Sequence, residues 1–372
     1  MEAARSIDGK VFVTGGAGHV GANLVHRLLT DGREVVALLR PDDNNAAIDA
    51  IEHATGRRVE RVIGDLRDPT VLRRGLDGCA SAFHVAAKIS TATESAASLR
   101  ALFESNVIGT SNVLRAAREA GTRRVVVTGS FSAVGYDPSN PQQPSDETMP
   151  FQPLDHHMPY GRTKMLVEHE CLKAVVEGQD VVIATSCAVL GPWDFLPSRM
   201  GRTLVDFANG KLRAYIPGGF EFVAAKDLVE GHLLAMQRGR AGQRYIFSTE
   251  FLTVDQILDV FEEVSGRPRP RLRLPPQVMA WLAAVSSFVL SKVTPTSPQR
   301  FTPGAVRILR MQRHANLHKA KTELGYEPTS ARDAIREAYA DFARRGLVPP
   351  GPAESKERVA PRSVNHEKGL SA

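Results

Sequence analysis

The chain has 372 residues, of which 42% are hydrophobic and 24% charged, and its formal net charge is +6. Such a composition is typical of a soluble globular protein, and the length is sufficient for a full α/β core with a smaller second lobe. The basic residues are scattered and are not interleaved with aromatic residues, so the mildly basic character favours an enzyme with an anionic cofactor over a nucleic-acid-binding protein.

The three cysteines, Cys79, Cys171 and Cys187, are widely spaced and form no CxxC pair. Neither a disulfide framework nor a zinc site is therefore expected, and no other metal site is predicted. The first ten residues contain no apolar segment typical of a secretory signal. We expect a cytoplasmic protein.

The first half of the chain alternates short runs of β-branched residues with amphipathic segments such as residues 21–30 and 107–120. Apolar strands separated by helices indicate a parallel sheet covered on both faces. Six strands are predicted in this half, at residues 10–14, 34–39, 59–63, 80–84, 124–128 and 180–185.

A glycine-rich turn, TGGAGHVG at residues 14–21, joins the first predicted strand to the first helix. Gly15, Gly18 and Gly21 allow the backbone to turn tightly and to approach a pyrophosphate, whose charge then faces the helix N-terminus. A position between a strand and a helix favours a dinucleotide-binding turn over a glycine turn without a ligand. The predicted fold class is α/β, a Rossmann-type doubly wound parallel sheet with a smaller, mainly helical C-terminal lobe.

The segment YGRTK places Tyr160 and Lys164 four positions apart, on one face of a predicted helix. Free tyrosine titrates near pH ~10, which is too high for an efficient base at neutrality. A neighbouring cation, together with the charge of an oxidised nicotinamide, favours the phenolate, so we expect Lys164 and a bound cofactor to lower the pKa of Tyr160. The phenol is then suited to exchange a proton with a substrate oxygen.

These motifs resemble the extended short-chain dehydrogenase/reductase family, of the NAD-dependent epimerase/dehydratase type. The family's further motifs occur in the same order: GDL at residues 64–66, FHVAA at 83–87, NVIGT around Asn106, KDL at 226–228 and LGYEP at 324–328. The resemblance covers roughly residues 10–345. It is strongest to the branch that contains dihydroflavonol reductases, 3β-hydroxysteroid dehydrogenases and hopanoid-associated epimerase-like proteins, and it implies an NAD(P)-dependent dehydrogenase/reductase.

The resemblance also implies the residues of the site. Ser130, in TGSFSAVG, lies where the family keeps its catalytic serine, with Ser132 as a nearby alternative. Its hydroxyl would stabilise negative charge that develops on the substrate oxygen. The expected catalytic residues are Ser130, Tyr160 and Lys164. The expected cofactor-binding residues are Thr14, Gly15, Gly18, His19, Val20, Gly21, Arg40, Asp65, Leu66, Ala86, Ala87, Asn106, Tyr160 and Lys164.

The end of the second predicted strand favours NADP(H). NAD-selective proteins place an acidic side chain there to accept hydrogen bonds from the ribose hydroxyls. This chain has Leu39 followed by Arg40, and the planar guanidinium of an arginine pairs well with a 2′-phosphate. NADP is therefore the expected cofactor, with NAD as the alternative.

After residues 191–192 the regular alternation ends, and proline, glycine and aromatic residues become frequent. A further strand is predicted at 244–248 and a helix over 253–266, capped by Thr253. The expected organisation is an NADP-binding domain over residues 1–190 to which 224–249 returns, a substrate-binding lobe over 191–349, and a disordered tail over 350–372.

Residues 278–293, VMAWLAAVSSFVLSKV, form the most apolar stretch of the chain. It is too short to span a membrane, which needs ~20 apolar residues. Two interpretations remain open: a buried lid helix that lines a pocket for a lipid-like substrate, or a peripheral anchor on an anionic membrane surface. Both indicate an apolar substrate.

The function expected first is therefore an NADP(H)-dependent oxidoreductase that interconverts an apolar ketone and a secondary alcohol, with Tyr160 as acid and base. A nucleotide-sugar epimerase or dehydratase that retains its NAD(P) is the second hypothesis. Thr185 and Ser186 weaken it, because they replace residues common in sugar-nucleotide members. A non-enzymatic NADP-sensing protein is the third, and the presence of both Tyr160 and Lys164 argues against it. A homodimer is expected by analogy with the family.

Overall fold

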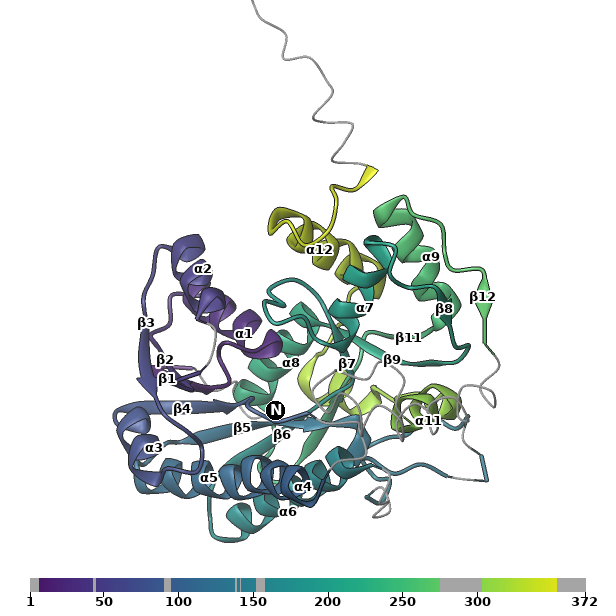
Figure 1. Ribbon diagram of the computed structural model, residues 1–372. Helices are drawn as coiled ribbons and strands as arrows, with labels where there is room; N and C mark the ends of the chain where they lie inside the picture. The colour runs from purple at the N-terminus through teal and green to yellow at the C-terminus, as the bar shows by residue number, and fades with distance from the viewer. Residues whose placement is uncertain are drawn as a thin grey trace, which may run out of the picture.

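A computed structural model describes residues 7–42, 45–89, 95–137, 139–140, 142–151, 158–274 and 303–352, with side chains in the last range from residue 307 (Figure 1). The apolar stretch 278–293 lies outside the described residues, as does the predicted tail apart from residues 350–352. Within the described residues, no helix combines the length and the apolar character that crossing a membrane would require.

The centre of the molecule is a parallel sheet of seven strands in the order β10-β6-β5-β4-β1-β2-β3. Each pair of neighbouring strands is parallel. The strands are β1 (Lys10–Thr14), β2 (Val35–Leu39), β3 (Val59–Ile63), β4 (Cys79–His84), β5 (Arg124–Ser130), β6 (Val181–Ser186) and β10 (Arg244–Phe247). Every predicted strand is present, with ends that differ by two residues or fewer. The doubly wound α/β fold is confirmed.

Helices cover both faces of this sheet (Figure 1). One face carries α1 (His19–Thr30), α2 (Ala46–Thr55) and α8 (Ala225–Arg238); the other carries α3 (Pro69–Leu76), α5 (Gly109–Glu119) and α6 (Pro159–Val176). Alternate residues of one strand supply the two apolar cores: Val11 and Val13 pack with α1, whereas Phe12 packs with α3. Since successive side chains of a strand point to opposite faces, a continuous apolar run is what a sheet buried on both sides requires.

Two shorter segments bring further residues to the sheet edge. The helix α4 (Ala96–Phe103) continues through a π-helical turn, η1 (Glu104–Ile108), into α5, and the 3₁₀ turn η2 (Phe131–Ala133) follows β5 directly. A π-helical turn shifts the side chains that follow it around the helix axis and is frequent at functional sites.

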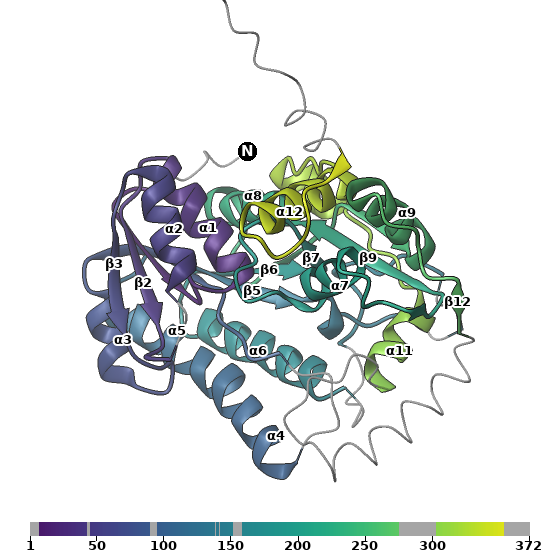
Figure 2. The same ribbon diagram turned by 45° about the horizontal axis from the view of Figure 1, so that its top comes forward.

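The C-terminal lobe has its own core between α7 (Arg199–Ala208), α9 (Val254–Ser265) and α12 (Ala331–Arg344) (Figure 2). Thr253 caps α9 through a capping box with Gln256, which confirms the predicted helix. The lobe further contains α11 (Pro303–Met311), whereas the π-helical turn η3 (Ala320–Leu324) returns to the main sheet and packs against α8 and β10.

Two small sheets of the lobe are not predicted by the sequence. One has the order β11-β9-β7, formed by β11 (Glu250–Thr253), β9 (Gly219–Ala224) and β7 (Ala188–Leu190); the other pairs β8 (Ala214–Tyr215) with β12 (Leu272–Arg273). These strands have two to six residues, so they are too short to show a clear two-residue period.

A buried arginine ties three elements together at the amino-terminal edge of the main sheet. The guanidinium of Arg124, at the start of β5, donates two hydrogen bonds of 2.9 Å to the carboxylate of Asp180. It also donates to the carbonyl oxygen of Met236 near the C-terminus of α8, over 2.9 Å. The Arg124 side chain is 6% exposed and that of Asp180 is 20% exposed.

We expect Arg124→Met to lower the free energy of unfolding by about 3 kcal/mol, because removing one partner of a buried ion pair leaves the other without its counter-charge. Urea denaturation followed by circular dichroism measures the loss. Arg123→Met is the matched control, because Arg123 is exposed, and it should change stability by less than ~0.5 kcal/mol. Equal stability of the two variants would contradict a structural role for Arg124.

Candidate active site and cofactor cleft

A cavity of about 980 Å³ lies at the carboxyl ends of the parallel strands, between the sheet and the C-terminal lobe. This is the edge at which open α/β sheets bind their ligands. The structure brings most of the predicted site residues together there. Those that line the cavity are Gly15, Gly18, His19, Val20, Gly21, Arg40, Asp65, Leu66, Ala86, Ala87, Ser130, Tyr160 and Lys164.

The glycine turn leaves no room for side chains. Gly15 has a φ of +72°, and a Cβ there would lie 2.8 Å from the Cα of Ala86. A Cβ on Gly21 would lie 2.0 Å from the carbonyl oxygen of Gly15. Gly18 precedes α1 in an extended conformation and has no side chain with which to cap the helix. The amide groups of the first turn of α1 are therefore placed for an anion, and the turn fits the pyrophosphate of a dinucleotide.

Thr14 and Asn106 are not among the residues that line the cavity, and they belong to a hydrogen-bond chain behind it. The Thr110 hydroxyl donates its hydrogen to the carbonyl oxygen of Asn106 over 2.6 Å. Because that hydrogen is used, the same hydroxyl oxygen accepts a hydrogen bond from Nε2–H of His84 over 2.9 Å. His84 Nδ1 then accepts from the Thr14 hydroxyl over 2.7 Å, and Thr14 Oγ1 accepts from the Ala86 amide over 3.2 Å. Burial lowers the pKa of His84 to about 3, which keeps the imidazole neutral. This series of hydrogen bonds holds the backbone of Ala86 against the glycine turn.

The side chain of Asn106 clamps the loop that follows β4. Its Oδ1 accepts from the Lys88 amide over 2.7 Å, and its Nδ2 donates to the Lys88 carbonyl oxygen over 2.9 Å. Nδ2 also donates to the hydroxyl of Thr163 over 3.0 Å. Because Thr163 precedes Lys164 on α6, Asn106 joins the floor of the cavity to the predicted catalytic helix.

The end of β2 carries a cluster of charged side chains. Nε of Arg40 lies 3.8 Å from Oδ1 of Asp42, and the Arg40 side chain is 60% exposed. Arg67, which the sequence reasoning missed, donates to Asp65 from Nε and Nη2 over 2.7 and 3.0 Å. These hydrogen bonds hold the pKa of Asp65 below its usual range, and the charge of Arg40 contributes in the same direction. Two guanidinium groups therefore line this end of the cavity.

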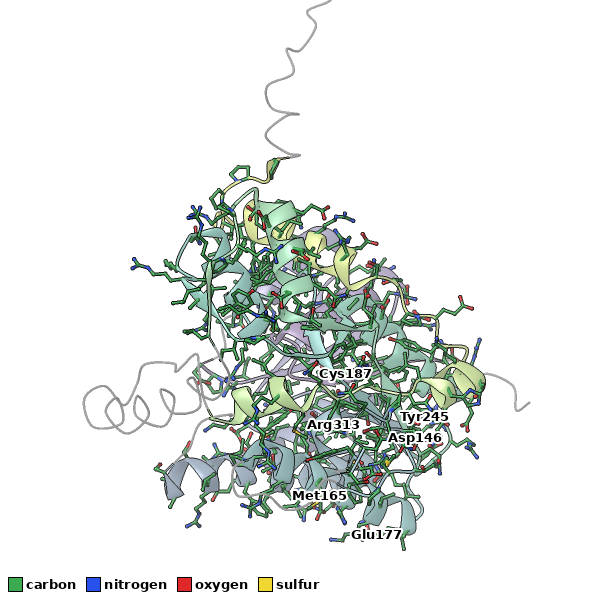
Figure 3. The ribbon with its side chains drawn as sticks, turned by 90° about the vertical axis from the view of Figure 1, so that its right-hand side faces the viewer. Asp146, Met165, Glu177, Cys187, Tyr245 and Arg313 are labelled. Carbon is green, nitrogen blue, oxygen red and sulfur yellow. The ribbon has the colours of Figure 1, made fainter. Side chains whose placement is uncertain are left out.

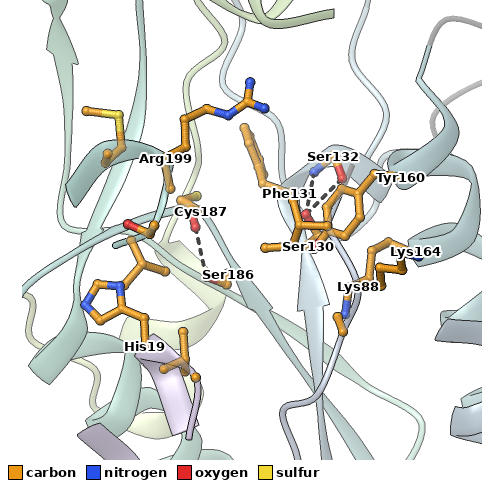
Figure 4. A pocket seen from close by; sticks show the side chains of 18 of the residues that line it. His19, Lys88, Ser130, Phe131, Ser132, Tyr160, Lys164, Ser186, Cys187 and Arg199 are labelled. Carbon is orange, nitrogen blue, oxygen red and sulfur yellow. Dashed lines mark hydrogen bonds between the residues drawn. The ribbon is translucent and has the colours of Figure 1, made fainter. Parts of the chain in front are cut away.

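The predicted catalytic residues Ser130, Tyr160 and Lys164 form one wall of the cavity, with His19, Cys187 and Arg199 on the facing wall (Figure 4). The hydroxyls of Ser130 and Ser132 lie 2.9 Å apart. Lys164 is 4% exposed, and its Nζ donates to the carbonyl oxygen of Thr128 over 2.7 Å. Burial lowers the pKa of Lys164 to about 8.

The protein groups around Tyr160 do not by themselves produce the expected lowering of its pKa. Burial raises the pKa of Tyr160 to about 12, and the hydrogen bond with Ser130 acts in the opposite direction without cancelling the effect. The physical reason is that removing the phenolate from water costs more free energy than the interaction with Ser130 returns. Tyr160 is therefore a protonated phenol at neutral pH, which suits it to donate a proton.

The half of the cavity that faces the lobe is mainly apolar. Its lining includes Leu196, Met200, Leu212, Tyr215, Ile216, Phe220, Ile257, Leu258, Phe261, Ile308, Leu309 and Met311. Arg199, Glu221 and Arg313 also line the cavity and were not predicted. The sequence gives little sign of them, because they lie on segments that are brought together by tertiary contacts. Among the described residues no group of three His, Cys, Asp or Glu side chains is placed to hold a metal ion.

Known proteins resemble the chain over most of its length. A model of the NAD dependent epimerase/dehydratase family matches residues 11–247. The sterol demethylase protein B of Methylococcus capsulatus is 41% identical, over 91% of this chain and 99% of that protein. A putative dihydroflavonol 4-reductase of Synechocystis sp. is 33% identical, over 91% of this chain and 95% of that protein. The crystal structure of gox2253 has a TM-score of 0.77 and 30% identity, over 92% of this chain and 100% of that chain.

The family match and the geometry of the cavity agree. Gly15, Gly18 and Gly21 form the dinucleotide turn, and Tyr160 and Lys164 face the same cavity. The resemblance inferred from the motifs is thereby confirmed. The chain belongs to the NAD-dependent epimerase/dehydratase family of extended short-chain dehydrogenases/reductases and is an NAD(P)-dependent oxidoreductase.

Proposed function

We propose that the protein interconverts an apolar ketone and the corresponding secondary alcohol, with NADP(H) as its cofactor. The observation that carries this proposal is the position of Ser130, Tyr160 and Lys164 on the wall of a cavity whose far half is lined mainly by aliphatic and aromatic side chains. A substrate held by that half would present its polar oxygen to the hydroxyl groups of Ser130 and Tyr160 on the opposite wall.

The three residues have separate roles. The nicotinamide, when bound, supplies or accepts the hydride. Tyr160 donates a proton to the substrate oxygen in the reduction, since its raised pKa keeps the phenol protonated. Ser130 donates a hydrogen bond to the same oxygen and stabilises its developing negative charge. Lys164, anchored on the carbonyl oxygen of Thr128, supplies positive charge beside the reacting groups.

Two further features support an apolar substrate. Phe220 and Phe261 face the cavity from two different elements of the lobe, and Ile308 and Leu309 do so from α11. The names of two relatives, sterol demethylase protein B and a putative dihydroflavonol 4-reductase, refer to a sterol and to a dihydroflavonol rather than to a sugar nucleotide. A sugar nucleotide would leave this surface facing its hydroxyl groups, which costs free energy without paired hydrogen bonds.

The preference for NADP(H) is supported by the end of β2. Leu39, where an acidic residue would bind the ribose hydroxyls, is buried and apolar, and Arg40 follows it at the cavity edge. Arg67 lies on the same part of the lining. A 2′-phosphate placed there would meet two guanidinium groups, each able to donate charge-assisted hydrogen bonds.

The catalytic assignment predicts that Tyr160→Phe lowers kcat by ~10²–10⁴-fold, while the Kd for NADPH changes little, because phenylalanine keeps the packing but has no proton to transfer. Turnover is followed by NADPH absorbance on a panel of sterol ketones and flavanones. Tyr339→Phe, which removes the hydrogen bond to the Pro349 carbonyl oxygen far from the cavity lining, is the matched control.

UDP-glucose and dTDP-glucose belong in the same panel. Their conversion without net change in NADPH, together with no reaction of any apolar ketone, would contradict the proposed function in favour of an epimerase or dehydratase.

The cofactor assignment predicts that the wild-type protein binds NADPH more tightly than NADH and that Arg40→Ala reduces this preference by ~10–100-fold, the loss expected for a hydrogen-bonded charge pair. Fluorescence titration of both cofactors measures it. Arg33→Ala is the control, since Arg33 lies outside the cavity lining. Equal affinity of the wild-type protein for NADPH and NADH would contradict the assignment.

Because Lys164 is buried, we expect it to lower the stability of the folded protein although its charge serves the proposed reaction. Its pKa falls from 10.5 to about 8 in the folded protein, which corresponds to about 3 kcal/mol against the charged form. A methionine at position 164 also loses the hydrogen bond to the Thr128 carbonyl oxygen, and this loss offsets roughly 1 kcal/mol of the gain in stability. We therefore expect cofactor-free Lys164→Met to be about 2 kcal/mol more stable than the wild-type protein at pH 7.

The stability difference between the wild-type protein and Lys164→Met depends on pH, because Lys164 binds its proton less tightly in the folded than in the unfolded state. Between pH 8 and 10.5 the unfolded lysine binds more protons than the folded one, so the wild-type protein gains stability relative to Lys164→Met as the pH rises. Urea denaturation of both proteins at pH 7, 8, 9 and 10 gives this difference, in which the other titrating groups cancel. A stability difference that does not change with pH would show that Lys164 is not buried in its charged form.

A further inference from the structure

Arg313, two residues beyond α11, is a buried cation that the proposed mechanism does not use. It is 9% exposed and lines the cavity (Figure 3). Within the described part of the chain, all its hydrogen-bond partners are neutral: the carbonyl oxygens of Phe131, Val134 and Gly135 and the hydroxyl of Ser145. Its Nε has no partner there.

Such an arrangement is unfavourable for stability alone. Burial lowers the pKa of the Arg313 guanidinium to about 10, which reports the cost of keeping the charge away from water. An apolar side chain of similar volume often gives an equal or more stable core than a buried ion does. The charge at position 313 is therefore better explained by what it holds than by its contribution to folding.

Arg313 binds the turn of residues 131–135, which follows Ser130 directly. Ser130 is the last residue of β5, and the three carbonyl oxygens bound by Arg313 belong to the next five residues. Nη2 donates to the carbonyl oxygens of Val134 and Gly135, each over 2.9 Å. The guanidinium also lies over the ring of Phe131, 4.4 Å from its centroid. Hydrogen bonds and ring contact together fix the turn from both ends.

The segment that carries Arg313 is anchored independently. The Ser145 amide donates to the carbonyl oxygen of His314 over 2.8 Å, and the Asn316 amide donates to that of Ser145 over 2.9 Å. The Ala315 amide donates to Glu221 of β9 over 2.9 Å. Arg313 thus reaches the catalytic turn from a segment bound to the small sheet of the substrate lobe.

We propose that Arg313 is a positioning residue, which holds the turn 131–135 and thereby keeps the Ser130 hydroxyl in place on the cavity wall that also carries Tyr160. This inference rests on the roles proposed for Ser130 and Tyr160. Arg313 also makes the geometry of the catalytic serine depend on the lobe that binds the substrate. No contact of Arg313 with a reacting atom is required.

The test reads the ionisation of Tyr160 directly and needs no substrate. The full-length protein is labelled with 3-fluorotyrosine, saturated with NADP⁺, and titrated with alkali while ¹⁹F NMR spectra are recorded. The resonance of residue 160 is assigned by its absence in Tyr160→Phe. The charged and titratable side chains that line the same cavity are His19, Arg40, Asp65, Arg67, Lys88, Lys164, Cys187, Arg199, Tyr215, Glu221, Arg307 and Arg313.

Arg313→Lys is the principal variant, because it keeps the positive charge but loses the planar fork that reaches several carbonyl oxygens at once. We expect it to raise the titration midpoint of Tyr160 by about one pH unit, as Ser130→Ala should also do, because each variant weakens or removes the effect by which the Ser130 hydroxyl lowers the Tyr160 pKa. In the Ser130→Ala background, Arg313→Lys should add no further shift.

Arg345→Lys is the matched control. Arg345 is a largely buried arginine of the lobe that binds Asp341 and lies over Phe195, and it is outside the cavity lining. Its substitution should lower stability without moving the Tyr160 midpoint. A shift of the same size in Arg345→Lys would overturn the proposal, since general loosening of the lobe would then be sufficient.

The outcomes separate this inference from the proposed function. A wild-type midpoint in Arg313→Lys, or additive shifts of Arg313→Lys and Ser130→Ala, would overturn the positioning role while leaving the oxidoreductase assignment intact. A shift of the Tyr160 midpoint in Arg313→Lys that disappears in the Ser130→Ala background supports the positioning role, whether or not a ketone of the panel is reduced. Failure to reduce any ketone counts against the proposed function alone.

Discussion

The parallel direction of all seven strands is the constraint on which the site depends. Because the carboxyl ends of parallel strands meet at the same edge of a sheet, segments more than a hundred residues apart in the sequence are brought together there. β1 ends in the glycine turn, β2 at Arg40, β4 before Ala86 and β5 at Ser130. The catalytic helix α6 then has to place Tyr160 and Lys164 against an edge that is already crowded with backbone.

Two buried cations of the site, Lys164 and Arg313, form their hydrogen bonds with neutral groups in the described part of the chain, whereas the exposed Arg67 at the other end of the cavity pairs with Asp65. Lys164 binds the Thr128 carbonyl oxygen, and Arg313 binds three carbonyl oxygens and a hydroxyl. Carboxylates in these places would stabilise the two cations, but they would also cancel the positive potential that a negatively charged substrate oxygen meets in the reaction. The chain therefore keeps buried charges that are costly for folding, as enzymes often do at their active sites.

The sequence predicts those parts of the structure that depend on local patterns. Continuous apolar runs identify the strands of the main sheet, and the glycines at 15, 18 and 21 identify a turn in which a Cβ would collide with backbone atoms. The same reasoning places Thr14 and Asn106 among the cofactor ligands, whereas the structure places both behind the cavity lining, in hydrogen bonds to His84 and Lys88.

What depends on distant segments is not predicted. Arg313 has no motif around it, and its role is visible only when residues 131–135 lie beside it. The direction of the Tyr160 pKa is likewise missed, because a helical spacing shows the neighbouring lysine but not the loss of water around the phenol. The short strands of the lobe are stabilised by their contacts with each other and with α12 rather than by a repeating pattern of their own.

The two halves of the cavity are therefore specified in different ways. On the sheet side, the lining is made of glycines, short side chains and the catalytic residues, whose identity is restricted by close backbone contacts and by the chemistry of proton transfer. On the lobe side, Phe220, Phe261 and Leu309 are restricted only by volume and apolar character, and apolar residues of similar size can replace one another at modest cost. Substitutions there can change which apolar molecule fits while Tyr160 and Lys164 stay in place. Family membership consequently identifies the reaction class more closely than the substrate, which the lobe side of the cavity would select by its shape.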